Sequence, residues 1–181
     1  MDSQSGKVLW FTGLSGAGKT TTAKKLAEQL SAAGRRVELL DGDELRSTIC
    51  KGLGFSKEDR MENIRRIVYV AKLLARNGVF VLVSAITPYQ EMRDYARSEI
   101  PQYVEVYVRC SLAECERRDV KGLYAKAKRN EITRFTGISD PYEEPRNPEL
   151  IIDTETSTPA ENIGKINLWL ANQSAWIGEN V

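Results

Sequence analysis

The stretch GLSGAGKT at residues 13–20 decides the fold of this chain, because it follows an apolar run and opens an amphipathic one. Its spacing is that of a phosphate-binding loop, G-x-x-x-x-G-K-[ST]. In such a loop the glycines let backbone N–H groups turn toward the β-phosphate, the lysine reaches the β/γ oxygens and the hydroxyl ligates Mg²⁺. A glycine-rich turn without a ligand would explain the glycines but not Lys19 and Thr20 at the right offset. The stretch therefore predicts nucleoside triphosphate binding by Gly13, Leu14, Ser15, Gly16, Ala17, Gly18, Lys19, Thr20 and Thr21.

Length and charge narrow the class of protein. The 181 residues are enough for one domain with its own core, so we expect a single domain over residues 1–181. The 26 basic and 25 acidic residues give a net charge of +1, which predicts neither a nucleic-acid partner nor an anionic membrane. Histidine is absent from the sequence, so base and metal chemistry must fall to carboxylates.

The cysteines and the N-terminus indicate a compartment. Cys50, Cys110 and Cys115 lack metal-ligand spacing and are typical of a reducing environment. Residues 1–7 are too short and polar for a signal peptide, and no apolar run approaches membrane-spanning length. We expect a soluble, cytoplasmic protein.

Short apolar runs rich in branched residues alternate with helical patterns. This alternation is typical of a parallel sheet covered by helices on both faces. We expect a P-loop NTPase-type three-layer α/β/α fold with a five-stranded parallel sheet and a lid. The expected strands are residues 8–11, 37–40, 79–83, 104–108 and 150–152.

Helix starts are marked by capping residues. The first helix should run over residues 19–33 and stop at Gly34, and the second should start near Ser56 and end at residues 77–78. Later starts carry the same spacing of hydroxyl and Glu or Gln, which predicts N-caps at Thr87, Ser111 and Thr158.

Residues 117–148 form a basic segment punctuated by glycine and proline, without a clear period. An ordered loop of this length is usually functional, for example as an active-site lid, although a merely solvated basic loop is the alternative. Lys121 and Lys126 are the lid cations we expect to act on phosphate.

The carboxylate that holds Mg²⁺ is expected after a different strand from the usual one. Phosphate-loop hydrolases commonly place an Asp after a second apolar strand, but here residues 79–83 run into Ser84 and Ala85. Residues 37–40 run instead into Asp41-Gly42-Asp43, at the edge where open α/β sheets bind ligands. One aspartate can orient Mg²⁺ and the other an acceptor hydroxyl, whereas a turn with a helix cap is the structural alternative.

Basic residues after these carboxylates favour transfer to an acceptor. Arg46 lies one helical turn beyond Asp43, and Arg60 and Asn63 share a face of the following helix. Arginine offers forked donors to phosphate or sulfate, although solvated helix charges are the alternative. The N-K-x-D sequence of guanine-specific switch proteins is absent from the chain, which argues against that class.

Six motifs in order resemble the adenylyl-sulfate kinase family: GLSGAGKTT, LDGDELR, GLGFSKEDRMENIRR, ITPYQEMR, RDVKGLYAKA and FTGISDPYEEP. They span nearly the whole chain. The resemblance implies transfer of the ATP γ-phosphoryl group to the 3′-hydroxyl of adenosine 5′-phosphosulfate, giving ADP and 3′-phosphoadenosine 5′-phosphosulfate. It implies ATP as co-substrate, Mg²⁺ held by Thr20 and Asp41, sulfate activation as the role, and a homodimer.

The resemblance also implies site residues. Lys19, Asp41, Asp43 and Thr87 are the implied catalytic residues. The implied acceptor site comprises Asp43, Arg46, Phe55, Arg60, Asn63, Ile86, Thr87, Lys121, Leu123 and Phe135. Phe55 and Phe135 suit stacking on an adenine, with plain core packing as the alternative.

One position departs from the family pattern. Thr87 stands where the family usually has a serine that has been proposed to become phosphorylated. Because threonine keeps the hydroxyl but crowds it, we expect a capping and substrate-contact role here rather than a covalent intermediate.

Two other functions stay open at this point. A small-metabolite kinase of the gluconate or shikimate type would share the sheet and the phosphate loop. A nucleotide-binding module without turnover would need no acceptor, although Lys19, Thr20, Asp41 and Asp43 argue against it.

Overall fold

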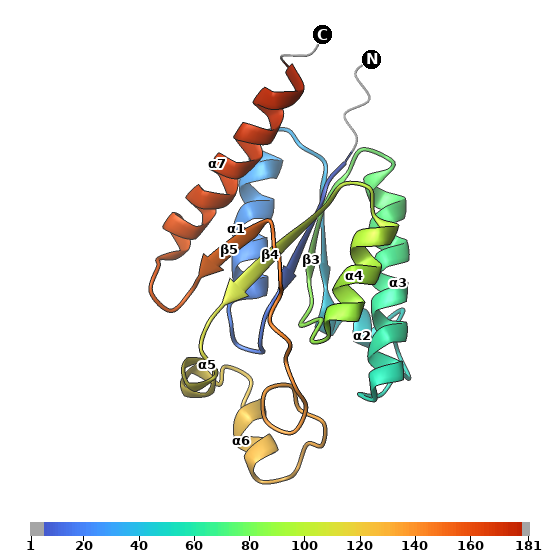
Figure 1. The fold of residues 1–181 in the computed structure, drawn as a ribbon, viewed down its shortest axis with the longest axis vertical. Helices are drawn as coiled ribbons and strands as arrows, with labels where there is room; N and C mark the ends of the chain where they lie inside the picture. The colour runs from blue at the N-terminus through green and yellow to red at the C-terminus, as the bar shows by residue number, and fades with distance from the viewer. Residues whose placement is uncertain (1–5, 179–181) are drawn as a thin grey trace.

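The sheet has five parallel strands, as the sequence predicts. The computed structural model describes residues 6–178, with side chains described up to residue 173. The strands are β1 (Val8–Thr12), β2 (Val37–Asp41), β3 (Phe80–Ser84), β4 (Tyr103–Arg109) and β5 (Leu150–Asp153), in the order β2-β3-β1-β4-β5 (Figure 1). The prediction for residues 1–7 concerns a segment whose first five residues lie outside this description.

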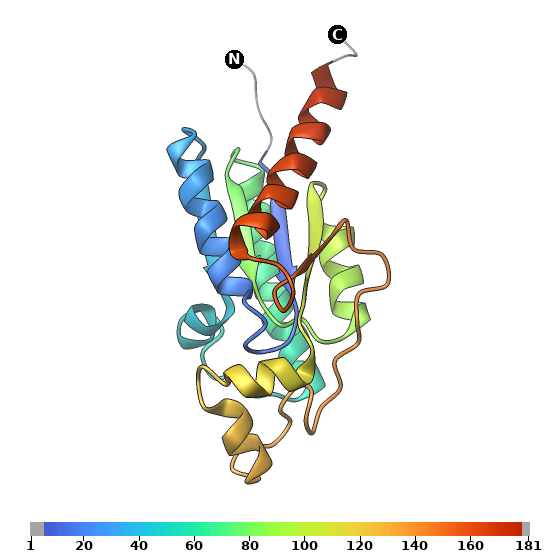
Figure 2. The same ribbon diagram turned by 90° about the vertical axis from the view of Figure 1, so that its left-hand side faces the viewer.

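Helices cover both faces of the sheet and complete the three layers (Figure 2). Helices α1 (Lys19–Ala32) and α7 (Pro159–Gly178) lie on one face, and α3 (Lys57–Ala75) and α4 (Gln90–Glu99) on the other. Each face has its own apolar cluster, with Leu26 and Ile166 in one and Ile67 and Met92 in the other. All of these side chains are fully buried.

Three short helices lie beyond the carboxyl ends of the strands, where Figure 1 shows the chain extending away from the sheet. They are α2 (Gly42–Ser47), α5 (Leu112–Arg118) and α6 (Leu123–Lys128). The expectation of an irregular segment over residues 117–148 was therefore wrong at its start, because α5 ends and α6 lies inside it. Six residues are too few to display a helical period in sequence.

The capping predictions were confirmed at three helices and wrong at one. The hydroxyls of Ser56, Ser111 and Thr158 accept from the N–H groups of residues 59, 114 and 161. Helix α4 instead begins after Tyr89, which makes no side-chain cap, and its Gln90 N–H donates to Glu143 Oε2 at 2.7 Å. Thr87 cannot cap because its side chain turns into the sheet.

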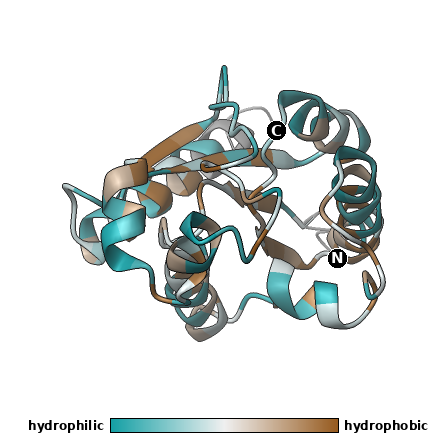
Figure 3. Cartoon of the chain, turned by 90° about the horizontal axis from the view of Figure 1, so that it is seen from below, coloured by the Kyte–Doolittle hydropathy of each residue, from teal (hydrophilic) through white to brown (hydrophobic). Residues whose placement is uncertain are grey.

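Hydropathy follows the layers (Figure 3). The strands are coloured hydrophobic through the centre, and much of the surrounding helical surface is hydrophilic. Among the residues described, none of the helices combines the length and apolar character needed to cross a bilayer. Cys50, Cys110 and Cys115 are buried free thiols.

Candidate active site

The donor loop, residues 13–20, connects β1 to α1 through backbone conformations that require glycine. Gly13, Gly16 and Gly18 have φ values of 151°, 76° and 94°. A Cβ on Gly13 would lie 2.5 Å from the carbonyl oxygen of Val108, so a side chain there would collide with β4. The loop is thus fixed against the sheet, with α1 starting directly at Lys19. This places the positive end of the α1 dipole at the loop, which favours anions.

Lys19 lies folded over the donor loop. Its Nζ donates to the carbonyl oxygens of Gly13 at 2.9 Å and Leu14 at 2.7 Å, and its side chain is buried. Burial disfavours the charged form and lowers the pKa of Lys19 to about 8. The lysine is therefore mostly protonated at neutral pH, and its charge is poorly solvated.

Thr20 and Asp41 come together at the ends of α1 and β2. The Thr20 hydroxyl donates to Asp41 Oδ2 at 2.7 Å and lies 2.9 Å from the Ser84 hydroxyl. Asp41 Oδ1 caps α2 by accepting from the N–H groups of Asp43 at 3.0 Å and Glu44 at 3.5 Å. The structural alternative for Asp41, a helix cap, is thus present together with the contact to Thr20.

Asp43 faces the lid from the first turn of α2. Its Oδ2 pairs with Lys121 Nζ, so one predicted catalytic residue contacts one predicted lid cation. Both side chains are more than half exposed, and such a pair contributes little to stability. The contact places a carboxylate and an ammonium group side by side in the lining of one cavity.

Two arginines lie on one phenylalanine. The Arg46 guanidinium carbon is 4.4 Å from the centroid of the Phe55 ring, and that of Arg60 is 5.5 Å away. Arg46 also donates to the carbonyl oxygen of Gly54 at 3.1 Å. Phe55 is 49% exposed, so its ring is accessible beside two fixed positive charges.

Arg60 connects α3 to the lid. Its Nη2 donates to the carbonyl oxygen of Arg134 at 2.6 Å and pairs with Asp140 at 3.4 Å, while Nε donates to the Phe55 carbonyl at 3.1 Å. Burial lowers the pKa of Arg60, but the ordinary value is high enough that the group stays charged. The guanidinium is therefore a buried cation that contacts both Phe55 and residues 134 and 140.

Asn63 and Thr136 present buried polar atoms without partners. Asn63 Oδ1 and Thr136 Oγ1 have no hydrogen-bond partner among the described residues, although both residues are over nine-tenths buried. Phe135, next to Thr136, packs edge-on against Tyr124 at a centroid distance of 4.9 Å and belongs to the core. A buried polar atom of this kind needs a partner, and a ligand can provide one.

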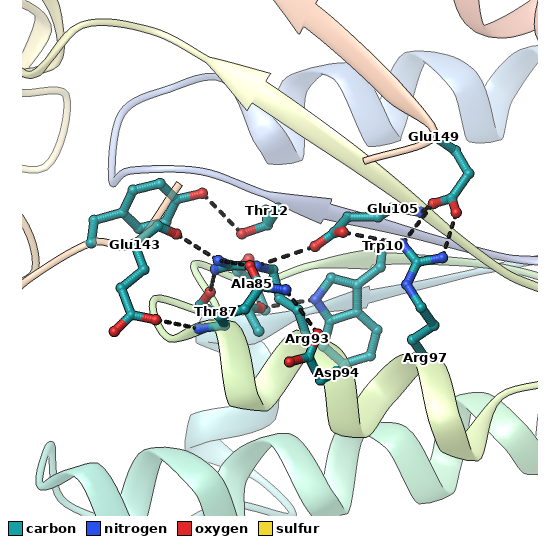
Figure 4. A network of polar contacts seen from close by, with 12 residues as sticks. Trp10, Thr12, Ala85, Thr87, Arg93, Asp94, Arg97, Glu105, Glu143 and Glu149 are labelled. Carbon is teal, nitrogen blue, oxygen red and sulfur yellow. Dashed lines mark hydrogen bonds and ion pairs between the residues drawn. The ribbon is translucent and has the colours of Figure 1, made fainter. Parts of the chain in front are cut away.

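Thr87 is buried in the loop after β3 and has a left-handed backbone, φ 50°. This conformation costs a residue of its kind about 1–3 kcal/mol. Its hydroxyl donates to the Ala85 carbonyl at 3.2 Å and accepts from the Trp10 indole N–H at 2.8 Å, as Figure 4 shows. The hydroxyl is thus engaged by the protein on both its donor and acceptor sides.

One cavity of about 470 Å³ joins these groups, a volume that suits a small-molecule site. The donor loop lines it through Ser15, Gly16, Gly18, Lys19, Thr20 and Thr21, whereas Gly13, Leu14 and Ala17 do not line it. The other predicted residues in its wall are Asp41, Asp43, Arg46, Phe55, Arg60, Asn63, Ile86, Thr87, Lys121, Leu123 and Phe135.

The sequence interpretation missed Ser84 and Thr136, which also line the cavity. Ser84 was noted only as a position without an acid, yet the parallel register pairs it with Asp41. The signal that could have found it is a hydroxyl residue at the end of a central strand.

Comparisons with known proteins agree with this arrangement. The family model described as "Adenylylsulphate kinase" matches residues 5–153. An adenylyl-sulfate kinase of Picosynechococcus sp. is 58% identical over 161 residues, covering 89% of this chain and 91% of the relative. The solved Mycobacterium tuberculosis APS kinase, in complex with AMPPNP and APS, is 45% identical with a TM-score of 0.88, covering 92% of this chain and 98% of that one.

A more distant structure shares the fold alone. A gluconokinase from Sinorhizobium meliloti is 18% identical with a TM-score of 0.67, covering 98% of this chain and 99% of that one. The architecture is therefore common to several small-molecule kinases. The family match and the close relative decide among them: this chain belongs to the adenylyl-sulfate kinase family.

Proposed function

We propose that this enzyme, an adenylyl-sulfate kinase, moves the ATP γ-phosphoryl group directly to the 3′-hydroxyl of adenosine 5′-phosphosulfate. The products are ADP and 3′-phosphoadenosine 5′-phosphosulfate, and the role is sulfate activation. The observation that carries the proposal is the single cavity in which the donor loop faces Arg46, Arg60 and Asn63. ATP bound at the donor loop and adenosine 5′-phosphosulfate bound at the two arginines would have their reacting groups close together.

On the donor side, Lys19 neutralises the β/γ-phosphate oxygens and the loop N–H groups hold the β-phosphate. Thr20 and Asp41 fit Mg²⁺ because both present oxygen atoms, which this hard cation prefers, and it commonly takes few protein ligands beside phosphates. Mg²⁺ held there would supply positive charge that offsets the negative charge of the ATP phosphates.

On the acceptor side, the guanidinium groups of Arg46 and Arg60 suit a phosphosulfate. Phe55 and Phe135 both line the cavity, and their rings would stack on the adenine. Asn63 Oδ1 is an acceptor for a donor group of the ligand. Ile86, Thr87 and Leu123 supply the remaining wall.

Transfer proceeds in line, with positioning and charge neutralisation supplying most of the catalysis. Asp43 accepts a hydrogen bond from the 3′-hydroxyl and takes its proton late, and Lys121 beside it shifts toward the transferring phosphoryl group. Closure of the lid, residues 117–148, excludes water and so suppresses hydrolysis of ATP.

Thr87 contacts substrate rather than becoming phosphorylated. Its hydroxyl proton points to the Ala85 carbonyl, and among the described residues no carboxylate hydrogen-bonds to this hydroxyl to act as a base. Activation of this oxygen as a nucleophile would require its proton to move from the Ala85 carbonyl to a base.

The test is an assay of the purified protein with ATP, Mg²⁺ and adenosine 5′-phosphosulfate, with the nucleotide products separated. Formation of the 3′-phosphorylated product supports the proposal, and its absence overturns it. Gluconate and shikimate in place of the acceptor test the metabolite-kinase alternative, and ADP release distinguishes turnover from mere nucleotide binding. We further propose that the protein is a homodimer and that it lies in the cytoplasm. A measurement of the molar mass of the protein as it elutes from a column tests the homodimer.

A further inference from the structure

The strained Thr87 is held on three sides. Its hydroxyl binds Trp10 and Ala85, and its carbonyl oxygen accepts from Arg93 Nη1 at 2.7 Å. A β-branched residue rarely adopts a left-handed backbone unless its surroundings over-determine it. The third of these contacts comes from outside the cavity, since Arg93 is not among the residues that line it.

Arg93 is itself fixed by buried charge. Its side chain is 0% exposed and pairs through Nε with Glu105 Oε1 on β4 at 3.2 Å. Glu105 also pairs with Arg97, and Arg97 with Glu149 (Figure 4). The ion pair balances the buried charge, and hydrogen bonds from Nη1 to the Thr87 carbonyl and from Nη2 to the Glu143 carbonyl orient the guanidinium.

The same guanidinium holds the lid. We call residues 141–145 the return segment, because here the chain runs back from the lid toward the sheet (Figure 2). Arg93 Nη2 donates to the Glu143 carbonyl at 2.6 Å, and Glu143 N–H donates to the Pro88 carbonyl at 2.8 Å. The Tyr142 hydroxyl lies 3.1 Å from Thr12 Oγ1, which donates to the Ile86 carbonyl. The return segment and residues 86–88 are therefore joined at several points.

We propose that Arg93 is a positioning residue for phosphoryl transfer, which fixes the left-handed Thr87 in the cavity wall and fastens the return segment of the lid to it. Arg93 therefore holds both the part of the cavity wall that contains Thr87 and the return segment of the lid. This inference rests on the proposed function. Its action is indirect, because Arg93 touches neither substrate side of the cavity.

The test compares Arg93→Lys with Arg97→Lys. Both variants keep a positive charge beside Glu105, but lysine lacks the forked donors that reach Thr87 and Glu143 together. Arg97 lies one turn further along α4 and pairs with Glu105 and Glu149 rather than with Thr87, so it is the matched control. We expect kcat of Arg93→Lys to fall by about 10- to 100-fold, with KM for ATP changed less than about twofold. Arg97→Lys should keep kcat near that of the unaltered protein.

A spectroscopic measurement separates positioning from simple destabilisation. The chain has three tryptophans, and Trp10→Phe assigns the indole N–H signal of Trp10 in a ¹⁵N spectrum. This signal should shift in Arg93→Lys, because Thr87 loses its carbonyl partner, and stay in place in Arg97→Lys. Equal kcat values and equal Trp10 signals in the two variants would overturn the inference. If the unaltered protein forms no product, the proposed function fails, while the Trp10 comparison still tests the anchor.

A second, milder pair of variants tests the inference if Arg93→Lys does not fold. Glu143→Ala removes the exposed contact to the Gln90 N–H, and Glu91→Ala, in the same turn of α4, removes only a surface pair with Lys57. We expect KM for adenosine 5′-phosphosulfate to rise about three- to tenfold in Glu143→Ala alone. Equal acceptor KM values in both variants would contradict the inference.

Discussion

The donor loop takes its shape from the backbone, whereas the acceptor side of the cavity takes its shape from side chains. Within eight consecutive residues, three left-handed glycines and one helix start create the donor loop. The proposed acceptor side combines Arg46 from α2, Arg60 from α3, Thr87 after β3 and Phe135 from the lid, which all line the cavity. A local motif can thus be read from its spacing, but an assembled site depends on the whole tertiary structure.

The largest expected effect follows from removing one positive charge from the donor loop. Lys19→Ala should lower kcat by about 10³-fold, because it removes the cation that neutralises the transferring phosphoryl group. A coupled ADP-release assay measures it. Lys24→Ala, on the exposed face of the same helix, should leave the rate near its starting value. Comparable losses of kcat in both variants would show that the overall positive charge of α1, rather than Lys19 itself, determines the rate.

A second change breaks the backbone of the donor loop. Gly13→Ala combines a disfavoured φ with a 2.5 Å approach to the Val108 carbonyl, so the free energy of unfolding should fall by about 1–3 kcal/mol. Gly164→Ala, where a Cβ meets nothing within 4 Å in α7, should instead raise it by about 0.5–1 kcal/mol. Denaturant titration of both variants checks the opposite signs.

A third change tests the proposed acceptor side of the cavity. Arg60→Ala should raise KM for adenosine 5′-phosphosulfate by about 10- to 100-fold, because hydrogen bonds to a charged group are lost. KM for ATP should stay close to its original value, since Arg60 does not touch the donor loop. Steady-state kinetics with each substrate varied separates the two constants. Arg65→Ala, an exposed neighbour on α3, serves as control, and equal rises in both KM values would contradict the assignment.

The smallest effect is a pH dependence of ATP binding. The pKa of Lys19 is about 8 in the free protein, so kcat/KM for ATP should fall about tenfold by pH 9 as the ammonium group loses its proton. Stability should move the other way. Because the folded pKa lies below the unfolded value of 10.5, the unfolded chain binds more protons between these values, and the free energy of unfolding rises with pH. A flat kcat/KM profile through pH 9 would contradict the assigned role of Lys19.

The elements of the fold were largely predictable. Each strand lies at the predicted run to within two residues at either end, because buried parallel strands carry continuous branched apolar residues. Ser56, Ser111 and Thr158 cap as expected, since capping depends on neighbours three residues apart. Thr87 has the same spacing but fails to cap, because the indole N–H of Trp10, which is distant in sequence, binds its hydroxyl instead.

The site was predictable only in part. Arg46, Arg60 and Asn63 could be placed on two helices by spacing, but the pairing of Arg60 with Asp140 crosses 80 residues and has no local signal. The buried pair of Arg93 and Glu105 likewise joins a helix to a strand, and each side chain alone reads as an ordinary surface charge. Tertiary structure decides which charges become buried.

Asp41 shows what the capping of α2 means for ion binding. One carboxylate oxygen accepts from two N–H groups and the other from Thr20, so its rotamer is set by the folded chain. The conformational entropy of this side chain is lost when the protein folds and not when a cation arrives. A divalent ion at Thr20 and Asp41 would thus meet a preorganised ligand, and a capping interaction would contribute directly to its affinity.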